Sequence, residues 1–74
     1  MNQELMVGDR VSIVKLPKYI KTADSMPMLR PPTVLAVGEE GLIIDRRPGG
    51  YWGVLFAHKG AFLLDSQYLQ KIVL

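Results

Sequence analysis

Prolines limit the secondary structure of this chain more than any other feature. Four of its five prolines lie between Pro17 and Gly38, and each proline lacks an amide donor and restricts the residue before it. No sustained helix is compatible with that spacing, although 33–37 has room for a short strand or one helical turn. The segment is otherwise a connection of about twenty residues, and ordered connections of that length are uncommon and often functional.

Short strands are predicted on both sides of this connection. An apolar, β-branched run covers 10–16 after a Gly-Asp turn, and Pro17 ends it because proline cannot donate to a ladder. After Gly38, turn residues separate further strands over 42–46, 51–56, 61–64 and 70–74. One helical turn is expected at 65–68, with Asp65 capping its free amides.

This order of elements predicts an all-β fold. The expected order is a strand, a long connection, a three-strand meander, a helical turn and a last strand. This is the plan of a small SH3-like barrel of five strands. Its long Pro/Met-rich loop would follow strand 1, and one 3-10 turn would precede the last strand. The 74 residues predict one domain, 1–74. A five-stranded oligonucleotide-binding barrel is the alternative, but the turn at 57–60 leaves no room for the helix that it usually contains.

The amino-acid composition limits which cellular compartment and which ligands are expected for this chain. The chain has no cysteine, which excludes disulfides and thiolate metal sites. The segment Met1–Asp9 lacks the basic region of a signal peptide, and no apolar run approaches the ~20 residues of a membrane helix. We therefore expect a cytoplasmic protein without membrane insertion. A net charge of +2 is too small to indicate nucleic acid by itself, and we expect a monomer.

Catalytic chemistry is not indicated. His58 is the only histidine and lies in a Lys/Gly turn, with no cysteine or second histidine to complete a metal site. The glycines match neither the P-loop nor the dinucleotide-binding pattern. We expect no enzymatic activity, no metal and no cofactor.

The proline-methionine segment is the first of three features that indicate macromolecular recognition. Methionines recur at surfaces that adapt to partners. Met26, Met28 and Leu29 therefore either cap the open end of the barrel or face a partner, and Arg30 follows them directly.

Two basic stretches beside aromatic residues are the other features. Arg46 and Arg47 precede an aromatic pair and suit an acidic surface or a phosphate, although Trp52 keeps the spacing of a core residue. Lys18, Tyr19 and Lys21 suit an acidic partner or RNA; the alternative is a solvated loop with a buried tyrosine. The candidate protein-binding residues are Lys18, Tyr19, Lys21, Met26, Met28, Leu29, Arg30, Arg46 and Arg47.

Several longer motifs are distinctive in combination. They are Gly8-Asp9-Arg10-Val11, Lys15-Leu16-Pro17, Met26-Pro27-Met28-Leu29-Arg30-Pro31-Pro32, Asp45-Arg46-Arg47-Pro48-Gly49-Gly50 and Gly60-Ala61-Phe62-Leu63-Leu64-Asp65. Together they resemble the SipA family, small cyanobacterial proteins that interact with the sensor histidine kinase NblS.

The resemblance implies an SH3-like regulator in stress and light signalling. It would bind the ATP-binding catalytic domain of the kinase and stimulate autophosphorylation, as part of two-component signalling. Three other functions remain open from the residues alone. They are a peripheral SH3-like subunit of a photosynthetic electron-transfer complex, an RNA- or ribosome-associated barrel, and a small enzyme.

Overall fold

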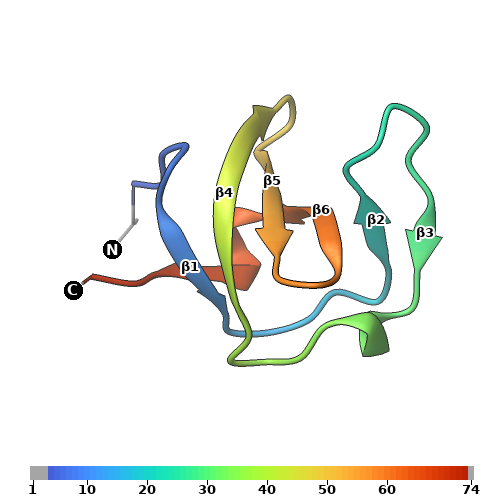
Figure 1. Ribbon diagram of the computed structural model, residues 1–74, viewed down its shortest axis with the longest axis horizontal. Helices are drawn as coiled ribbons and strands as arrows, with labels where there is room; N and C mark the ends of the chain where they lie inside the picture. Colours follow the sequence, from blue (N-terminus) through green and yellow to red (C-terminus); the bar gives the residue numbers. More distant parts are fainter. Residues whose placement is uncertain (1–3, 74) are drawn as a thin grey trace.

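A computed structural model describes residues 4–73 and shows a fold made of strands and two single-turn 3-10 helices. All strand pairs are antiparallel, and they form one seven-stranded sheet with the order β3-β2-β6-β5-β4-β1-β7 (Figure 1). The elements in chain order are β1 (Arg10–Ile13), β2 (Ile20–Thr22), β3 (Leu29–Arg30), η1 (Pro32–Val34), β4 (Glu40–Arg47), β5 (Tyr51–Phe56), β6 (Gly60–Asp65), η2 (Ser66–Tyr68) and β7 (Leu69–Lys71).

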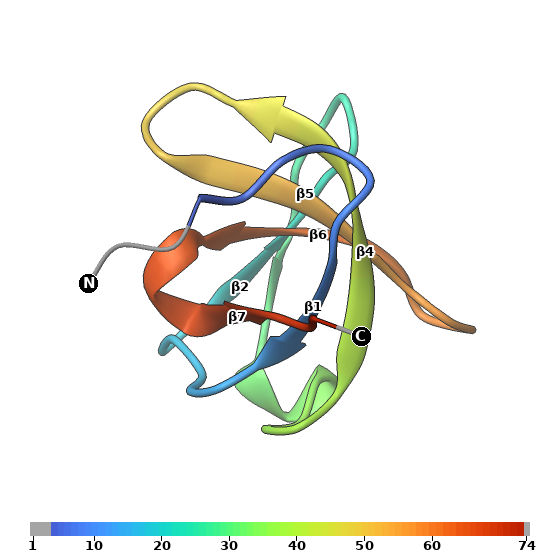
Figure 2. The ribbon, with the colours of Figure 1, turned by 90° about the vertical axis from the view of Figure 1, so that its left-hand side faces the viewer.

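The all-β prediction is confirmed, whereas a closed five-stranded barrel is not. The described strands number seven, and the sheet is open, with β3 and β7 at its edges. The two additional strands come from the connection that was expected to be irregular. Its prolines all lie outside β2 and β3, so no ladder hydrogen bond is lost to them. Viewed from the side, the sheet curls strongly, so that β1 crosses in front of β5 and β6 (Figure 2).

The hairpin of β2 and β3 is closed at Thr22. Its amide donates to the carbonyl of Met28 at 2.9 Å, and its hydroxyl accepts from the Met28 amide at 2.9 Å. Thr22 and Ile20 are buried while Lys21 between them is exposed, which is the alternation of a half-buried strand.

The turns near the C-terminal half agree with the sequence. Gly49 and Gly50 adopt φ values of 82° and 81°, which a hairpin turn of this kind requires. Asp65 accepts from the Gln67 amide at 3.2 Å and so caps η2, as predicted. The first strand is shorter than expected and ends at Ile13. Met1–Gln3 and Leu74, on which parts of the signal-peptide and last-strand predictions fall, lie outside the described residues.

The core lies on one face of the curled sheet. The rings of Phe56 and Phe62 meet there at a centroid distance of 6.2 Å, and Trp52 packs against the cluster, partly buried, as its spacing predicted. The buried apolar side chains are Leu5, Val11, Ile13, Ile20, Leu35, Ile43, Val54, Phe56, Phe62, Leu64 and Leu69.

A β-bulge at Ile44 changes the phase of β4. Ile43 is opposite Val54, and the next pair is Asp45 opposite Gly53, so Ile44 has no counterpart on β5. Val54 and Gly53 project to opposite faces because side chains alternate along a strand. Ile43 therefore points to the core, whereas Asp45 points to the other side, which we call the outer face. A bulge re-aims the side chains that follow it in this way.

Candidate docking surface

Cross-strand register collects chemically distinctive side chains on the outer face. Residues directly opposite each other in an antiparallel pair project to the same side. One row runs from Gly53 through Leu63 and Lys21 to Leu29, over β5, β6, β2 and β3. A second row joins Arg47, Tyr51 and Asp65, over β4, β5 and β6.

These two rows border a pocket of about 280 Å³. All three tyrosines of the chain line it, and they come from three separate segments: Tyr19 precedes β2, Tyr51 begins β5 and Tyr68 ends η2. Tyr19 is 67% exposed and Tyr51 is 45% exposed, so their rings remain available for contact. We call this site the tyrosine pocket. Its other walls are Pro17, Lys21, Leu29, Leu63, Leu64 and Asp65.

The rim of the tyrosine pocket carries more positive than negative charge. The Nζ atom of Lys15 lies 5.6 Å from the centre of the Tyr68 ring, a distance typical of a cation–π contact. Lys18 and Lys21 are exposed and form no ion pair within residues 4–73. The one carboxylate of the pocket, Asp65, already accepts from the Gln67 amide and from the Ser66 hydroxyl.

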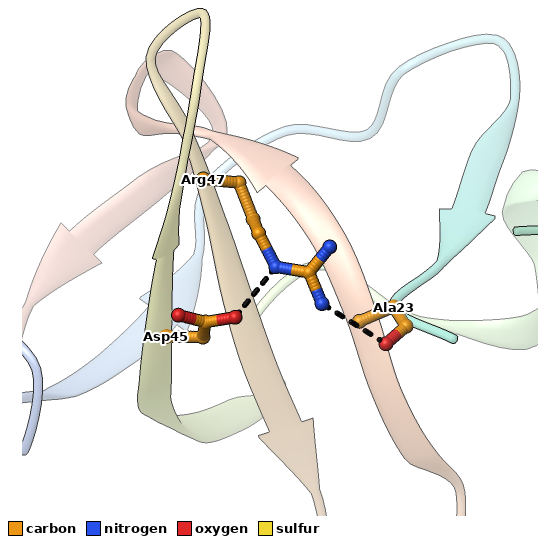
Figure 3. Close-up of polar contacts among 3 residues, drawn as sticks. All are labelled: Ala23, Asp45 and Arg47. Carbon is orange, nitrogen blue, oxygen red and sulfur yellow. Dashed lines mark hydrogen bonds and ion pairs between the residues drawn. The ribbon is translucent and has the colours of Figure 1, made fainter. Parts of the chain in front are cut away.

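Arg46 and Arg47 point to opposite faces. Arg46 is opposite Trp52, and its guanidinium carbon lies 5.6 Å from the centre of the indole ring. Arg47 lies on the outer face beside the tyrosine pocket. Its Nε donates to Asp45, and its Nη2 donates to the carbonyl of Ala23 (Figure 3). Both guanidinium groups are thus engaged within the chain, so a partner would have to share them.

The structure divides the sequence-predicted binding residues among four places: the tyrosine pocket and its rim, a second pocket, the connection between β2 and β3, and, for Arg46, the opposite face of the sheet. Tyr19, Lys21 and Leu29 meet in the tyrosine pocket, with Lys18 adjacent along the chain. Arg30 lines a different pocket of about 460 Å³, together with Asp24 and Lys59.

The methionines occupy the connection between β2 and β3. Met26 is 82% exposed and Met28 is 55% exposed, so they do not cap the core, and a partner contact remains a prediction for them. The core contains Leu5 and Leu35, and neither of these two methionines belongs to it.

Six pocket residues are absent from the sequence-predicted binding set: Pro17, Tyr51, Leu63, Leu64, Asp65 and Tyr68. Tyr68 was placed in the helical turn without a role, and Leu63 was treated only as part of a strand. Nothing in the sequence shows that β2 pairs with β6, and this pairing brings Leu63 and Asp65 beside Lys21.

Within residues 4–73, no three His, Cys, Asp or Glu side chains are placed to hold a metal ion together. His58 lies exposed in the turn between β5 and β6, in the left-handed region at φ 66°. Over the same residues, no helix has the length and apolar character to cross a membrane.

The fold and the pocket together define a small all-β protein with an aromatic, lysine-rimmed pocket. Residues 7–69 match the family described as Protein CHLORORESPIRATORY REDUCTION 42-like, so the chain belongs to this CRR42-like family. A curated relative, the chloroplastic Protein CHLORORESPIRATORY REDUCTION 42 of Arabidopsis thaliana, is 42% identical over 72 residues. The alignment covers 96% of this chain but 59% of the relative, so the chain spans less than two thirds of that protein. No solved structure matches.

These comparisons correct the family assignment. The resemblance to the SipA family is wrong, because the match over residues 7–69 includes the motifs that suggested it. The expected kinase partner, the stimulation of autophosphorylation and the role in two-component signalling lose their support with it. The expectation of a cytoplasmic protein is contradicted as well, since the relative is a chloroplastic protein. Turns and a proline-methionine loop on a small β fold were therefore insufficient to tell the two families apart.

Proposed function

We propose that this protein is a non-enzymatic, peripheral subunit of a photosynthetic electron-transfer complex and acts in chlororespiratory reduction. Membership of the CRR42-like family supports this proposal, together with the name of the 42% identical relative. Because the chain spans 59% of that relative, the proposal concerns the part that the two proteins share.

The observation that carries a docking role is the convergence of all three tyrosines on one pocket of the outer face. Tyrosine supplies a large apolar body and a polar tip, which is why it is enriched at protein interfaces. Exposed apolar side chains continue the same face beyond the pocket: Leu42 is opposite Leu55, and both are about 40% exposed (37% and 43%). Contiguous exposed apolar surface of this kind marks interaction sites.

The fold is well suited to a docking subunit. We infer that β1, β4, β5, β6, η2 and β7 correspond to an SH3-like plan, to which the hairpin of β2 and β3 adds a further wall; their order along the chain supports this inference. We infer that this addition distinguishes the protein from a plain five-stranded barrel. It contributes Lys21 and Leu29 to the tyrosine pocket.

Fractionation of photosynthetic membranes tests the proposal. The full chain, carrying an epitope tag, is expressed in its native host, and washed thylakoid membranes are solubilised gently and separated on a native gel. We expect the chain to migrate with a large electron-transfer complex and to return to the low-mass region when that complex is absent. Recovery of all the protein as a free low-mass species, in membranes that contain the intact complex, would contradict the proposal.

A further inference from the structure

We propose that the tyrosine pocket binds an extended acidic segment of a partner protein. An apolar side chain of the segment would enter between the tyrosine rings, and its carboxylates would lie against Lys15, Lys18 and Lys21. This inference rests on the proposed function, because it identifies the site and the partner chemistry through which the subunit docks.

The size of the pocket fits one or two side chains of a peptide. Its volume of about 280 Å³ falls just below the ~300–1,000 Å³ of pockets that enclose drug-sized ligands and cofactors. Pro17, Leu29 and Leu63 form apolar walls beside the tyrosines. A leucine-sized group held there would be the buried anchor of the interface.

The charge around the pocket selects an acidic segment. Lys15 lies over the Tyr68 ring, Lys21 is itself part of the wall, and Lys18 lies between two wall residues along the chain. Asp65 opposes them with one negative charge, whose Oδ1 accepts from the Gln67 amide and the Ser66 hydroxyl, so the three lysines outnumber it. Carboxylates of a partner would therefore meet unpaired ammonium groups, and such complementarity favours the correct partner and speeds association.

Single-stranded RNA is the competing ligand for lysines beside aromatic rings. Leu29 and Leu63 favour a protein segment, because these aliphatic walls suit an apolar side chain, whereas the tyrosine rings and Lys21 would suit either ligand. The apolar surface that continues over Leu42 and Leu55 likewise suits a protein partner. The net charge of only +2 also provides little of the electrostatic attraction on which RNA binding depends.

The test is a titration of the full-length, ¹⁵N-labelled protein with a synthetic acidic peptide, acetyl-Glu-Asp-Glu-Leu-Glu-Asp-Glu-amide. We expect saturable amide shifts confined to residues 15, 16, 18–21, 29, 51 and 63–68, and an affinity that falls as salt is added. A second peptide with glutamine in place of leucine should bind at least about fivefold more weakly, because it lacks the apolar anchor.

Two charge reversals on the same hairpin provide a matched control. Lys21 is opposite Leu29, whereas Arg30 is opposite the buried Ile20, so Lys21 and Arg30 lie on opposite faces of the two strands. Lys21→Glu and Arg30→Glu change the net charge equally. We expect Lys21→Glu to weaken binding of the acidic peptide about tenfold or more and Arg30→Glu by less than about twofold, because the Arg30 side chain projects away from the tyrosine pocket and water screens its charge. Tyr19→Ala, at an exposed ring, should also weaken it without disturbing the spectrum of the core.

Three results would overturn the inference. They are the absence of saturable shifts with the wild-type protein, equal weakening by Lys21→Glu and Arg30→Glu, and tighter binding of oligouridylate or of phosphatidylglycerol vesicles through the same amides. The membrane fractionation remains independent of this titration. Migration with the complex together with a failed titration rejects the pocket but keeps the proposed function, whereas a free low-mass protein rejects the function itself.

Discussion

Arg47 and Ala23 are joined by a hydrogen bond of 3.3 Å, from Nη2 to the backbone oxygen, although 24 residues separate them in sequence (Figure 3). In the strand order, β5 and β6 lie between β4 and β2. The two residues meet because the sheet curls instead of lying flat. The bond therefore ties the end of β4 to the start of the connection that carries the exposed methionines.

Replacing Arg47 with methionine should loosen that connection. Arg47→Met keeps the aliphatic stem but removes the hydrogen bonds to Asp45 and Ala23. We expect a loss of about 0.5–1 kcal/mol in the free energy of unfolding, because the guanidinium is partly exposed and screened by water. Urea denaturation measures the loss, and amide hydrogen exchange over 23–28 should become faster. Arg30→Met, at an exposed position of β3, is the control. Unchanged exchange over 23–28 in Arg47→Met would show that the bond does not restrain the connection.

Gly41 should tolerate no side chain. A Cβ at this buried position would lie 2.7 Å from Val54 Cγ1, 2.9 Å from Phe56 Cε1 and 3.0 Å from the Leu55 carbonyl oxygen. Gly41→Ala is expected to lower the free energy of unfolding by about 2–3 kcal/mol, since the core must shift to make room. Gly50→Ala serves as the comparison. Its Cβ would meet nothing within 4 Å, so its cost of about 1 kcal/mol reflects only the positive φ. Equal midpoints of urea unfolding for the two variants would contradict the close approach at Gly41.

Replacing Phe56 and replacing its neighbour Leu55 in β5 with alanine should have very different effects on the free energy of unfolding. Phe56 is 1% exposed and Leu55 is 43% exposed, because they project to opposite faces. Phe56→Ala should lower the free energy of unfolding by about 3–5 kcal/mol. A chain of this length has a total stability near the lower end of about 5–15 kcal/mol, so much of the variant should be unfolded at 25 °C. Leu55→Ala should cost less than about 1 kcal/mol. Thermal unfolding followed by circular dichroism distinguishes the two, and similar losses would mean that the faces are assigned incorrectly.

Asp65 combines a structural and an electrostatic role that two substitutions can separate. Asp65→Asn keeps an oxygen for the Gln67 amide, so stability should stay within about 0.5 kcal/mol, whereas Asp65→Ala should lose about 1 kcal/mol with the cap. Removing the only carboxylate from the tyrosine pocket should raise the affinity for the acidic peptide roughly two- to fivefold in Asp65→Asn. Calorimetric titration and urea unfolding measure the two effects. Weaker peptide binding by Asp65→Asn would be inconsistent with an acidic ligand in this pocket.

Much of the fold follows from local patterns in the sequence. The strand at 51–56 matches β5 in both bounds, because its side chains alternate between the core and solvent and glycines precede it. The cap at Asp65 and the 3-10 turn after it were equally readable, since capping depends only on neighbouring residues. The hairpin of β2 and β3 was missed because its strands have only three and two residues. Such short strands have little intrinsic preference, and they form here through pairing with β6, which is a tertiary effect.

The sequence also predicted only the part of the candidate site that is formed by neighbouring residues. Lys18, Tyr19 and Lys21 are adjacent in sequence, so a basic and aromatic patch was visible there. Its combination with Tyr51 and Tyr68 depends on the register of strands far apart in the chain. Registers of that kind are set by the burial of whole faces and not by any local motif.

Because of the bulge at Ile44, the presence of one residue determines which side chains at the end of β4 point to the outer face and which point to the core. Side chains alternate with a period of two, so deleting Ile44 would turn Asp45 and Arg47 toward Phe62 and the rest of the core, and would bring Arg46 outward. We therefore expect the chain length between Leu42 and Arg46 to be constrained more strictly than the identity of most residues within it. Across related sequences, insertions and deletions should concentrate in the turn 48–50 and be absent from 42–46, even where the residues themselves vary.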